Sequence, residues 1–215
     1  MNTKTGKNCL LESENDTWDY SKNISIRLKD PDAPKIYTIN FFHMVDWDAT
    51  KYKPYFDVFE KAKETDEIII YFNSPGGSVD VMNMFLNAFR TCKCKNITAR
   101  INKASSAAAI LALACNNIVF NTNSTMMLHT FSVWGMSGKS QELASDIKHT
   151  ASVYRKMCEP YLKKIMTDSE IDAMENGKDF YFDDTEAIKR LTHYIKTVKK
   201  SKVYTTKKAA KKHAK

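Results

Sequence analysis

Two short stretches of this chain join an expected strand to an expected helix through residues with little or no side chain. The first is Ser-Pro-Gly-Gly at 74–77, which follows the apolar run 68–72. Its glycines let a backbone approach a ligand closely and turn N–H groups outward, and a helix N-terminus behind them adds positive potential. The pattern suits an oxyanion hole or a phosphate site, and it also occurs as an ordinary strand-to-helix turn.

The second stretch is Lys-Ala-Ser-Ser-Ala-Ala-Ala at 103–109. A serine in the first turn of a helix most often caps it. Because Ser105 and Ser106 are adjacent, one can cap while the other reacts. The alanines after Ser106 leave room for a substrate and expose the N–H of Ala107, so Ser106 is a candidate nucleophile.

A histidine and an aspartate lie near other expected strands. His129 ends the apolar run 126–128, a position where a lone histidine is more often structural than catalytic. Asp179 precedes an apolar triplet and is either a turn residue or a buried partner for an imidazole. Asp183 and Asp184 are better explained as caps of the following helix.

The elements that must position these residues alternate between strand and helix, which predicts an α/β architecture. Residues 133–140 are expected to form a Gly/Ser loop or a glycine-rich strand, and residues 1–30 a polar arm. The expected strands are 36–42, 68–72, 97–101, 118–120, 126–128 and 180–182, and the expected helices are 51–64, 78–92, 106–115, 141–166, 168–176 and 185–191.

Length and composition fit one domain of 215 residues with an ample core. No apolar run approaches the roughly 18 residues of a membrane span, and the N-terminus lacks an apolar segment of signal-peptide length, so a cytoplasmic location is expected. The odd number of scattered cysteines favours reduced thiols, and no second pair accompanies Cys92–Cys94 to form a zinc site. The cysteines are Cys9, Cys92, Cys94, Cys115 and Cys158.

The net charge of +8 is concentrated at one end of the chain. Residues 196–215 hold nine of the 33 basic side chains and no acid, so the rest carries 24 basic and 25 acidic groups. We therefore expect a lysine-rich disordered tail at 199–215 that contacts a polyanion weakly, rather than a basic folded face.

The order and spacing of the motifs resemble the Clp protease proteolytic subunit, ClpP. Asn73–Val79 matches its Asn-Ser-Pro-Gly-Gly-Ser-Val, and Ala104–Ala108 matches its small-residue segment, with Ser106 in the nucleophile's place. Met127–His129 matches its Met-Ile-His, and Asp179–Tyr181 its Asp-Arg-Phe. The resemblance spans roughly 36–195. Departures are a slightly short Ser-to-His interval, an alanine where many members have methionine, and no axial-loop pattern in the N-terminal arm.

This resemblance implies a ClpP/crotonase-type fold in which 141–166 is a protruding handle helix. It implies a catalytic triad of Ser106, His129 and Asp179, with the N–H groups of Gly77 and Ala107 as the oxyanion hole. No metal or organic cofactor is expected. The implied partners are a polypeptide substrate, further copies in heptameric rings, and a Clp-type ATPase. The peptidase domain would cover 31–198, after a flexible arm at 1–30.

Small, divergent chains of this type resemble those encoded by bacteriophages, which fits a role in phage head maturation or in ATPase-assisted protein degradation, in a host cytoplasm. Three alternatives stay open at the level of the sequence. One is a relative of enoyl-CoA hydratase, which shares the fold. The second is a peptidase that uses Lys103 as the base for Ser106. The third is a catalytically silent scaffold or assembly protein.

Overall fold

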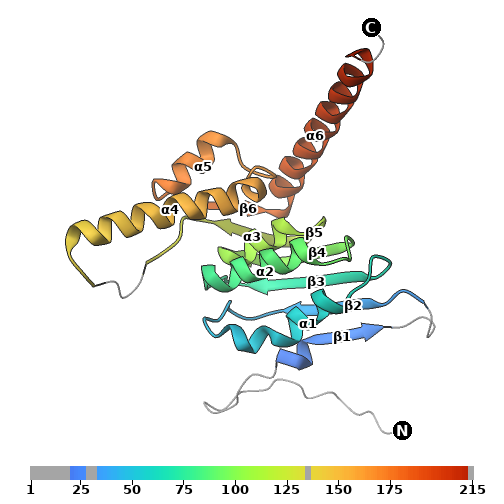
Figure 1. Cartoon of the computed structure of the whole chain (residues 1–215), viewed down its shortest axis with the longest axis horizontal. Coiled ribbons are helices and arrows are strands. Elements are labelled where there is room, and N and C mark those ends of the chain that lie inside the picture. The colour runs from blue at the N-terminus through green and yellow to red at the C-terminus, as the bar shows by residue number, and fades with distance from the viewer. Residues whose placement is uncertain (1–19, 28–32, 134–136, 213–215) are drawn as a thin grey trace.

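A single mixed sheet forms the centre of the molecule (Figure 1). The structure is a computed structural model that describes residues 20–27, 33–133 and 137–212, and it places side chains at 22–27, 33–133 and 137–198. The spatial order of the strands is the order of the sequence. They are β1 (Ile24–Arg27), β2 (Ile36–Phe41), β3 (Glu67–Ser74), β4 (Ile97–Ser105), β5 (Asn117–Leu128) and β6 (Phe180–Asp183). The expected α/β, ClpP-type fold is confirmed.

The four central strands, β2 to β5, are parallel, and β1 and β6 pair antiparallel at the two edges. The crossovers carry α1 (Lys53–Lys61), α2 (Val79–Thr91) and α3 (Ala107–Ala114). Since crossovers between parallel strands are right-handed, a sheet whose strands follow sequence order receives these helices on one face. Burial therefore alternates along β3, where Ile69 and Tyr71 are only half-buried. A continuous apolar run such as 68–72 is typical of a strand buried on both faces, and that interpretation is wrong here.

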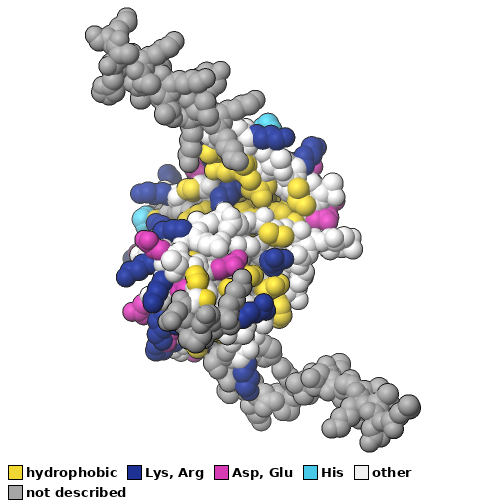
Figure 2. Space-filling model, turned by 90° about the vertical axis from the view of Figure 1, so that its right-hand side faces the viewer, with side chains coloured by type: hydrophobic (Ala, Val, Ile, Leu, Met, Phe, Trp, Pro, Cys, Tyr) yellow, Lys and Arg dark blue, Asp and Glu magenta, His cyan; other side chains and the backbone are white. Residues whose placement is uncertain are grey.

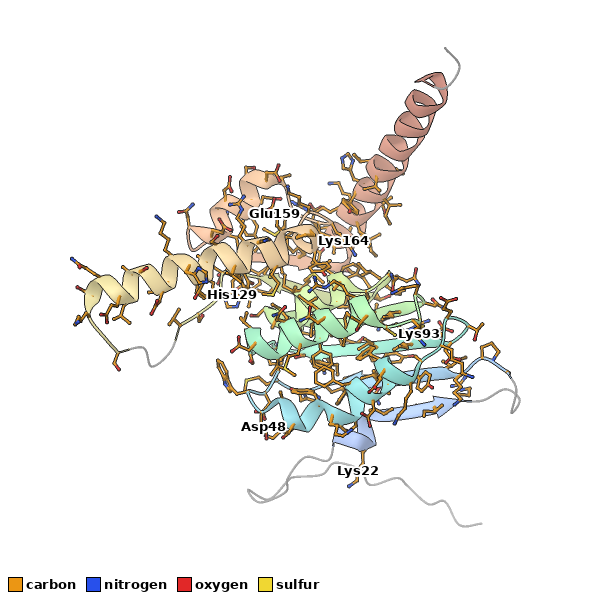
Figure 3. The ribbon with its side chains drawn as sticks, viewed as in Figure 1. Lys22, Asp48, Lys93, His129, Glu159 and Lys164 are labelled. Atoms are coloured by element: carbon orange, nitrogen blue, oxygen red, sulfur yellow. The ribbon has the colours of Figure 1, made fainter. Side chains whose placement is uncertain are left out.

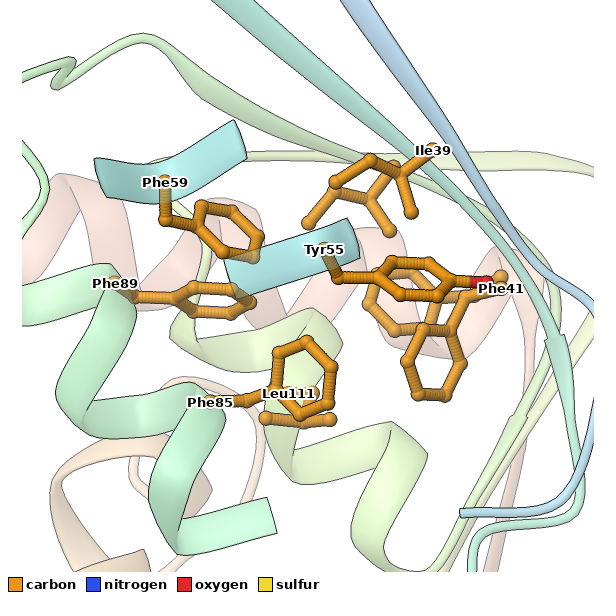
Figure 4. Close-up of a pocket in the computed structure, with 9 residues that line it drawn as sticks. Ile39, Phe41, Tyr55, Phe59, Phe85, Phe89 and Leu111 are labelled. Carbon is orange, nitrogen blue, oxygen red and sulfur yellow. The ribbon is translucent and has the colours of Figure 1, made fainter. Parts of the chain in front are cut away.

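Aromatic side chains fill the layer between the helices and the sheet (Figure 4). The Phe41 and Phe85 rings meet edge to face at 5.6 Å between centroids, and Phe59 and Phe89 at 4.9 Å. Tyr55 is fully buried among them. Each such side chain contributes roughly 1.5–3 kcal/mol on burial, so this layer fixes α1 and α2 against the sheet.

The N-terminal part is more ordered than the sequence predicts. Within the expected arm, a 3₁₀ helix at Tyr20–Asn23 leads into β1, which pairs with β2. Three of the four β1 residues are exposed, and its Ile-Ser-Ile-Arg alternation is only four residues long, which makes it a weak strand signal. Residues 1–19, which include Cys9, lie outside the described part.

The strand β5 joins two segments that the sequence separates. The expected strands 118–120 and 126–128 belong to one element, interrupted where Ile101 pairs with Phe120 and Lys103 with Thr125. This offset leaves 121–124 opposite a single residue of β4. The break in the apolar pattern therefore marks a bulge, which bends a strand and does not end it.

Three helices make up the C-terminal third, namely α4 (Ser140–Leu162), α5 (Asp168–Glu175) and α6 (Asp184–Lys212). Both α4 and α6 project from the body in Figure 1. The sequence predicts a last helix at 185–191 and a disordered tail, whereas the backbone is helical to Lys212. Lysine and alanine favour helix, which accounts for the extension. In the described part of the chain, no helix is long and apolar enough to cross a membrane.

Candidate active site

The candidate residues gather at one edge of the sheet. Gly76 and Gly77 follow β3, Ser106 follows β4, and His129 follows β5. Because these strands are parallel neighbours, their carboxyl ends meet, which is where α/β sheets place their ligand sites. Figure 3 shows His129 beside α4 at this end of the sheet and Lys93 at the other.

Ser106 occupies a sharp turn between β4 and α3. Its backbone angles are φ 54° and ψ −127°, a conformation that costs a residue other than glycine about 1–3 kcal/mol. Its N–H donates to the Met127 carbonyl at 2.8 Å, which holds the turn against β5. Its side chain makes no cap bond to α3. Instead, its Oγ lies 2.7 Å from Nε2 of His129. Ser105 ends β4 and is buried.

Tyr154 of α4 supports the backbone that carries the imidazole. Its hydroxyl donates to the His129 carbonyl at 3.4 Å, and its ring packs against Phe131 with centroids 5.5 Å apart. Burial raises the pKa of Tyr154, so the phenol stays protonated as a donor. Tyr154 belongs to no motif in the sequence. The one feature that points to its burial is its helical spacing from Cys158.

Asp179 lies next to His129 in register but does not contact it. The last pair between β5 and β6 is Leu128 with Phe180, so the next step would set His129 opposite Asp179. The Asp179 side chain is exposed. Among the hydrogen bonds of the described residues, none joins its carboxylate to the imidazole. The expected cap is present at Asp183, which accepts from the Glu186 N–H at 2.8 Å, while Asp184 accepts from Asn123 in the β5 bulge.

The glycine pair packs directly against the Ser106 turn. Gly76 has φ 93°, and a Cβ there would lie 2.5 Å from the Ser105 carbonyl oxygen and 2.7 Å from Ser106 Cβ. Val45, after β2, brackets Gly77 by donating to Gly76 O at 2.7 Å and accepting from Ser78 N at 2.8 Å. In the described residues, the N–H groups of Gly77 and Ala107 have no protein acceptor. Two amides beside Ser106 are therefore available to an oxygen of a ligand.

Comparison with known families adds to this geometry. A family model described as Clp protease matches residues 45–190. The chain belongs to the Clp protease family. The match includes the glycine pair, Ser106, His129 and Asp179, and it leaves out β1, β2 and the end of α6. Membership supports, in general terms, a ClpP-like serine peptidase.

In this Clp protease family member, an open cleft of about 840 Å³ extends from the Ser106–His129 pair. Its walls are mostly apolar and come from the loop after β2, from α2, from the segment after His129 and from α4. The apolar lining includes Met44, Trp47, Met82, Met127, Phe131, Val133 and Ile147. Met44 and Trp47 belong to no recognisable motif, so nothing in the sequence predicts that they line the cleft.

The loop that carries Met44 and Trp47 is anchored beneath the cleft. The His43 ring lies 3.1 Å from the Tyr55 hydroxyl and 3.0 Å from the Met44 carbonyl oxygen, both in hydrogen bonds. Burial lowers the pKa of His43, so the neutral ring is favoured in this position. The Ser74 hydroxyl donates to the His43 carbonyl, which joins this loop to the start of the glycine segment.

The described residues do not assemble a metal site. They contain no group of three or more His, Cys, Asp and Glu side chains able to hold an ion. Cys92, Cys94, Cys115 and Cys158 are buried free thiols. Burial raises the pKa of Cys115 and of Cys158 to about 12, so neither thiol is a ready nucleophile.

The expected strand or loop at 133–140 is a loop where it is described, and 134–136 lie outside the described residues.

Proposed function

We propose that the chain is a serine endopeptidase that hydrolyses peptide bonds with Ser106 as nucleophile and His129 as general base. The observation that carries this proposal is the 2.7 Å contact between Ser106 Oγ and His129 Nε2, at the carboxyl edge of the sheet in a Clp protease family member. A nucleophile and a base within hydrogen-bond reach are the first requirement of this chemistry.

In the proposed reaction, Ser106 Oγ attacks the peptide carbonyl and its proton moves to His129 Nε2. The imidazolium then gives that proton to the leaving amine, and water hydrolyses the acyl-enzyme by the same path in reverse. The N–H groups of Gly77 and Ala107 stabilise the oxyanion, each by roughly 3–4 kcal/mol. Ala107 is also the first residue of α3, so the helix N-terminus adds to this stabilisation.

Asp179 is proposed to orient the imidazole and to stabilise its charged form. Its support is its place one register step beyond the Leu128–Phe180 pair. The exposed carboxylate would have to turn toward His129 Nδ1 when substrate or a further copy of the chain binds. The proposed substrate is an extended polypeptide that lies beside 133–140, and the proposed assembly is a ring. A Clp-type ATPase partner and a role in phage head maturation remain hypotheses of the same origin.

Two alternatives are less well supported. Lys103 is exposed on β4 and does not line the cleft, so the lysine-base mechanism lacks a base at the nucleophile. A silent scaffold would keep the fold without a reactive serine, and a covalent label separates it from an enzyme.

A fluorophosphonate probe tests the proposal directly. We expect it to label the wild type and Ser105→Ala, because Ser105 is buried at the end of β4. Ser106→Ala should lose the label, and His129→Ala should lose nearly all of it. Because a nucleophile and its base act as a unit, the double variant Ser106→Ala/His129→Ala should cleave peptides almost as fast as either single variant. Labelling that survives in Ser106→Ala, or an unlabelled wild type in its assembled state, would refute the proposal.

A further inference from the structure

One acidic side chain lines a cleft whose other described walls are mostly apolar. Of the described residues that line it, Asp80 is the one acidic side chain, and none is a lysine or an arginine. Asp80 lies in the first turn of α2, three residues after Gly77. It therefore faces the same space as the proposed oxyanion amides and the Ser106–His129 pair.

The fold does not use this carboxylate as a cap or as a partner. The cap of α2 is Ser78, whose Oγ accepts from the Val81 N–H at 3.3 Å. Asp80 is exposed, and no ion pair of the described residues includes it. Asp46 and Asp57, by contrast, form ion pairs with Lys51 and Lys53. Asp80 is thus left available to a charge that comes from outside.

A charge in an apolar cleft acts more strongly than the same charge on an open surface. Low-dielectric walls focus its field, and a bound chain would exclude part of the screening water. The neighbour Val79 cannot neutralise Asp80, and because it is only partly buried it offers the aliphatic contact that a lysine or arginine stem prefers. A substrate cation would therefore find both a counter-charge and packing at this position.

We propose that Asp80 is a specificity-determining residue that favours polypeptides with a lysine or arginine close to the bond to be cut, next to side chains that fill the apolar walls. This inference rests on the proposed peptidase function and adds a substrate class to it. The same carboxylate disfavours peptides with an acidic residue at that position.

The test uses quenched fluorescent peptides that are identical except for Lys, Gln or Glu at one position, scanned over three residues on each side of the cleaved bond. At one position or more, the wild type should prefer Lys over Glu in kcat/KM by about fivefold or more, near the upper end for a partly exposed ion pair. Asp80→Asn should reduce this ratio toward one, Asp80→Glu should largely keep it, and added salt should weaken it. Glu64→Gln is the matched control, since Glu64 is exposed and does not line the cleft.

Peptide binding to Ser106→Ala separates this inference from the peptidase proposal. Fluorescence anisotropy with the same peptides should show tighter binding of Lys than Glu, and the additional Asp80→Asn change should abolish that difference. If the wild type cuts no peptide but this difference is present, the peptidase proposal fails and the role of Asp80 in binding stands. Equal Lys-to-Glu ratios in the wild type and Asp80→Asn, in both cleavage and binding, would overturn the inference.

Discussion

Gly76 is the residue whose side-chain space the site can least give up. With φ 93°, it already needs a conformation that L residues avoid, and a Cβ would collide with the backbone of Ser105 and with Ser106. We expect Gly76→Ala to push the nucleophile out of line with His129 and to lower kcat/KM by at least about 100-fold, as displacements near 1 Å do. The measurement is steady-state cleavage together with thermal unfolding.

Gly177 supplies a matched control for that change. Its φ is 94°, almost the same as at Gly76, but nothing lies within 4 Å of a Cβ placed there. Gly177→Ala should therefore cost only the backbone strain, about 1–2 kcal/mol of stability, and leave kcat/KM unchanged. Equal losses of activity in the two variants would show that strain, and not contact with the nucleophile's turn, accounts for the Gly76 effect.

At the scale of residues, the sequence identifies those candidate site residues that short local motifs mark. The glycine pair and Ser106 both interrupt apolar runs with small residues, and the structure places them with His129 at one edge. The residues it missed, Tyr154, Trp47 and Asp80, reach the cleft from elements whose packing decides their direction. The orientation of Asp179 likewise depends on a side-chain torsion that no spacing reveals.

At the scale of elements, Lys164 joins the C-terminal third to the helix of the nucleophile. Its ammonium donates to the carbonyls of Leu113 and Cys115 at the end of α3, at 3.3 Å for Cys115. Lys164→Met keeps the aliphatic stem but leaves these carbonyls without a donor, which should lower the free energy of unfolding by about 1–3 kcal/mol. Because Ser106 directly precedes α3, we also expect kcat to fall.

The adjacent lysine is the control. Lys163 is exposed and pairs with Glu159 at 2.6 Å and Asp168 at 3.2 Å, so Lys163→Met should cost at most about 1 kcal/mol. Urea denaturation of both variants gives the comparison. The Lys164 assignment fails if the two lose the same stability.

The elements also show which signals a sequence carries and which it lacks. Strongly apolar strands and helices with clear periodicity were predicted near their observed bounds, as for α2 and β2. The strand β1 was missed because its four-residue alternation is short and lies within a polar segment, and pairing with β2 completes it. At α5, the Thr167–Glu170 capping box sets the start at Asp168, which is where the sequence predicts it.

At the scale of the whole molecule, apolar residues are exposed on the projecting half of α4. The side chain of Ile147 is 44% exposed and that of Val153 is 50% exposed. Leu162, at the end of the helix, and Ile165, just after it, are buried. Such a surface fits an interface between copies of the chain. Since Ile147 also lines the cleft, Val153→Asp is the cleaner change. It should split the assembly and reduce peptidase activity together, because a carboxylate would be buried unpaired.

Light scattering alongside peptide cleavage measures both effects. Ser152→Asp adds the same charge at another exposed position of α4, about 100° or more around the helix from both Val153 and Ile147, and should leave the assembly intact. A wild type that is monomeric and fully active would contradict the prediction.

The other end of the molecule presents a different surface. Figure 2 shows the side away from the carboxyl ends of the parallel strands, where hydrophobic side chains gather in the upper half of the described surface and lysine and arginine side chains lie around them. The cleft and this surface thus lie at opposite ends of the parallel strands, so a partner bound at one need not cover the other.

The strand order, identical to the order of the sequence, governs when this protein can become active during its synthesis. The ribosome releases β2, β3 and β4 first, and each can pair with its predecessor as it emerges. Ser106 then waits about 75 residues for β6, roughly 4–15 s at about 5–20 residues per second. Over much of that interval the nascent chain lacks Tyr154 and Asp179. With Asp179 in its proposed role, a chain cut short before α4 would be an inert product, and translation itself would delay the appearance of a protease until β6 has emerged.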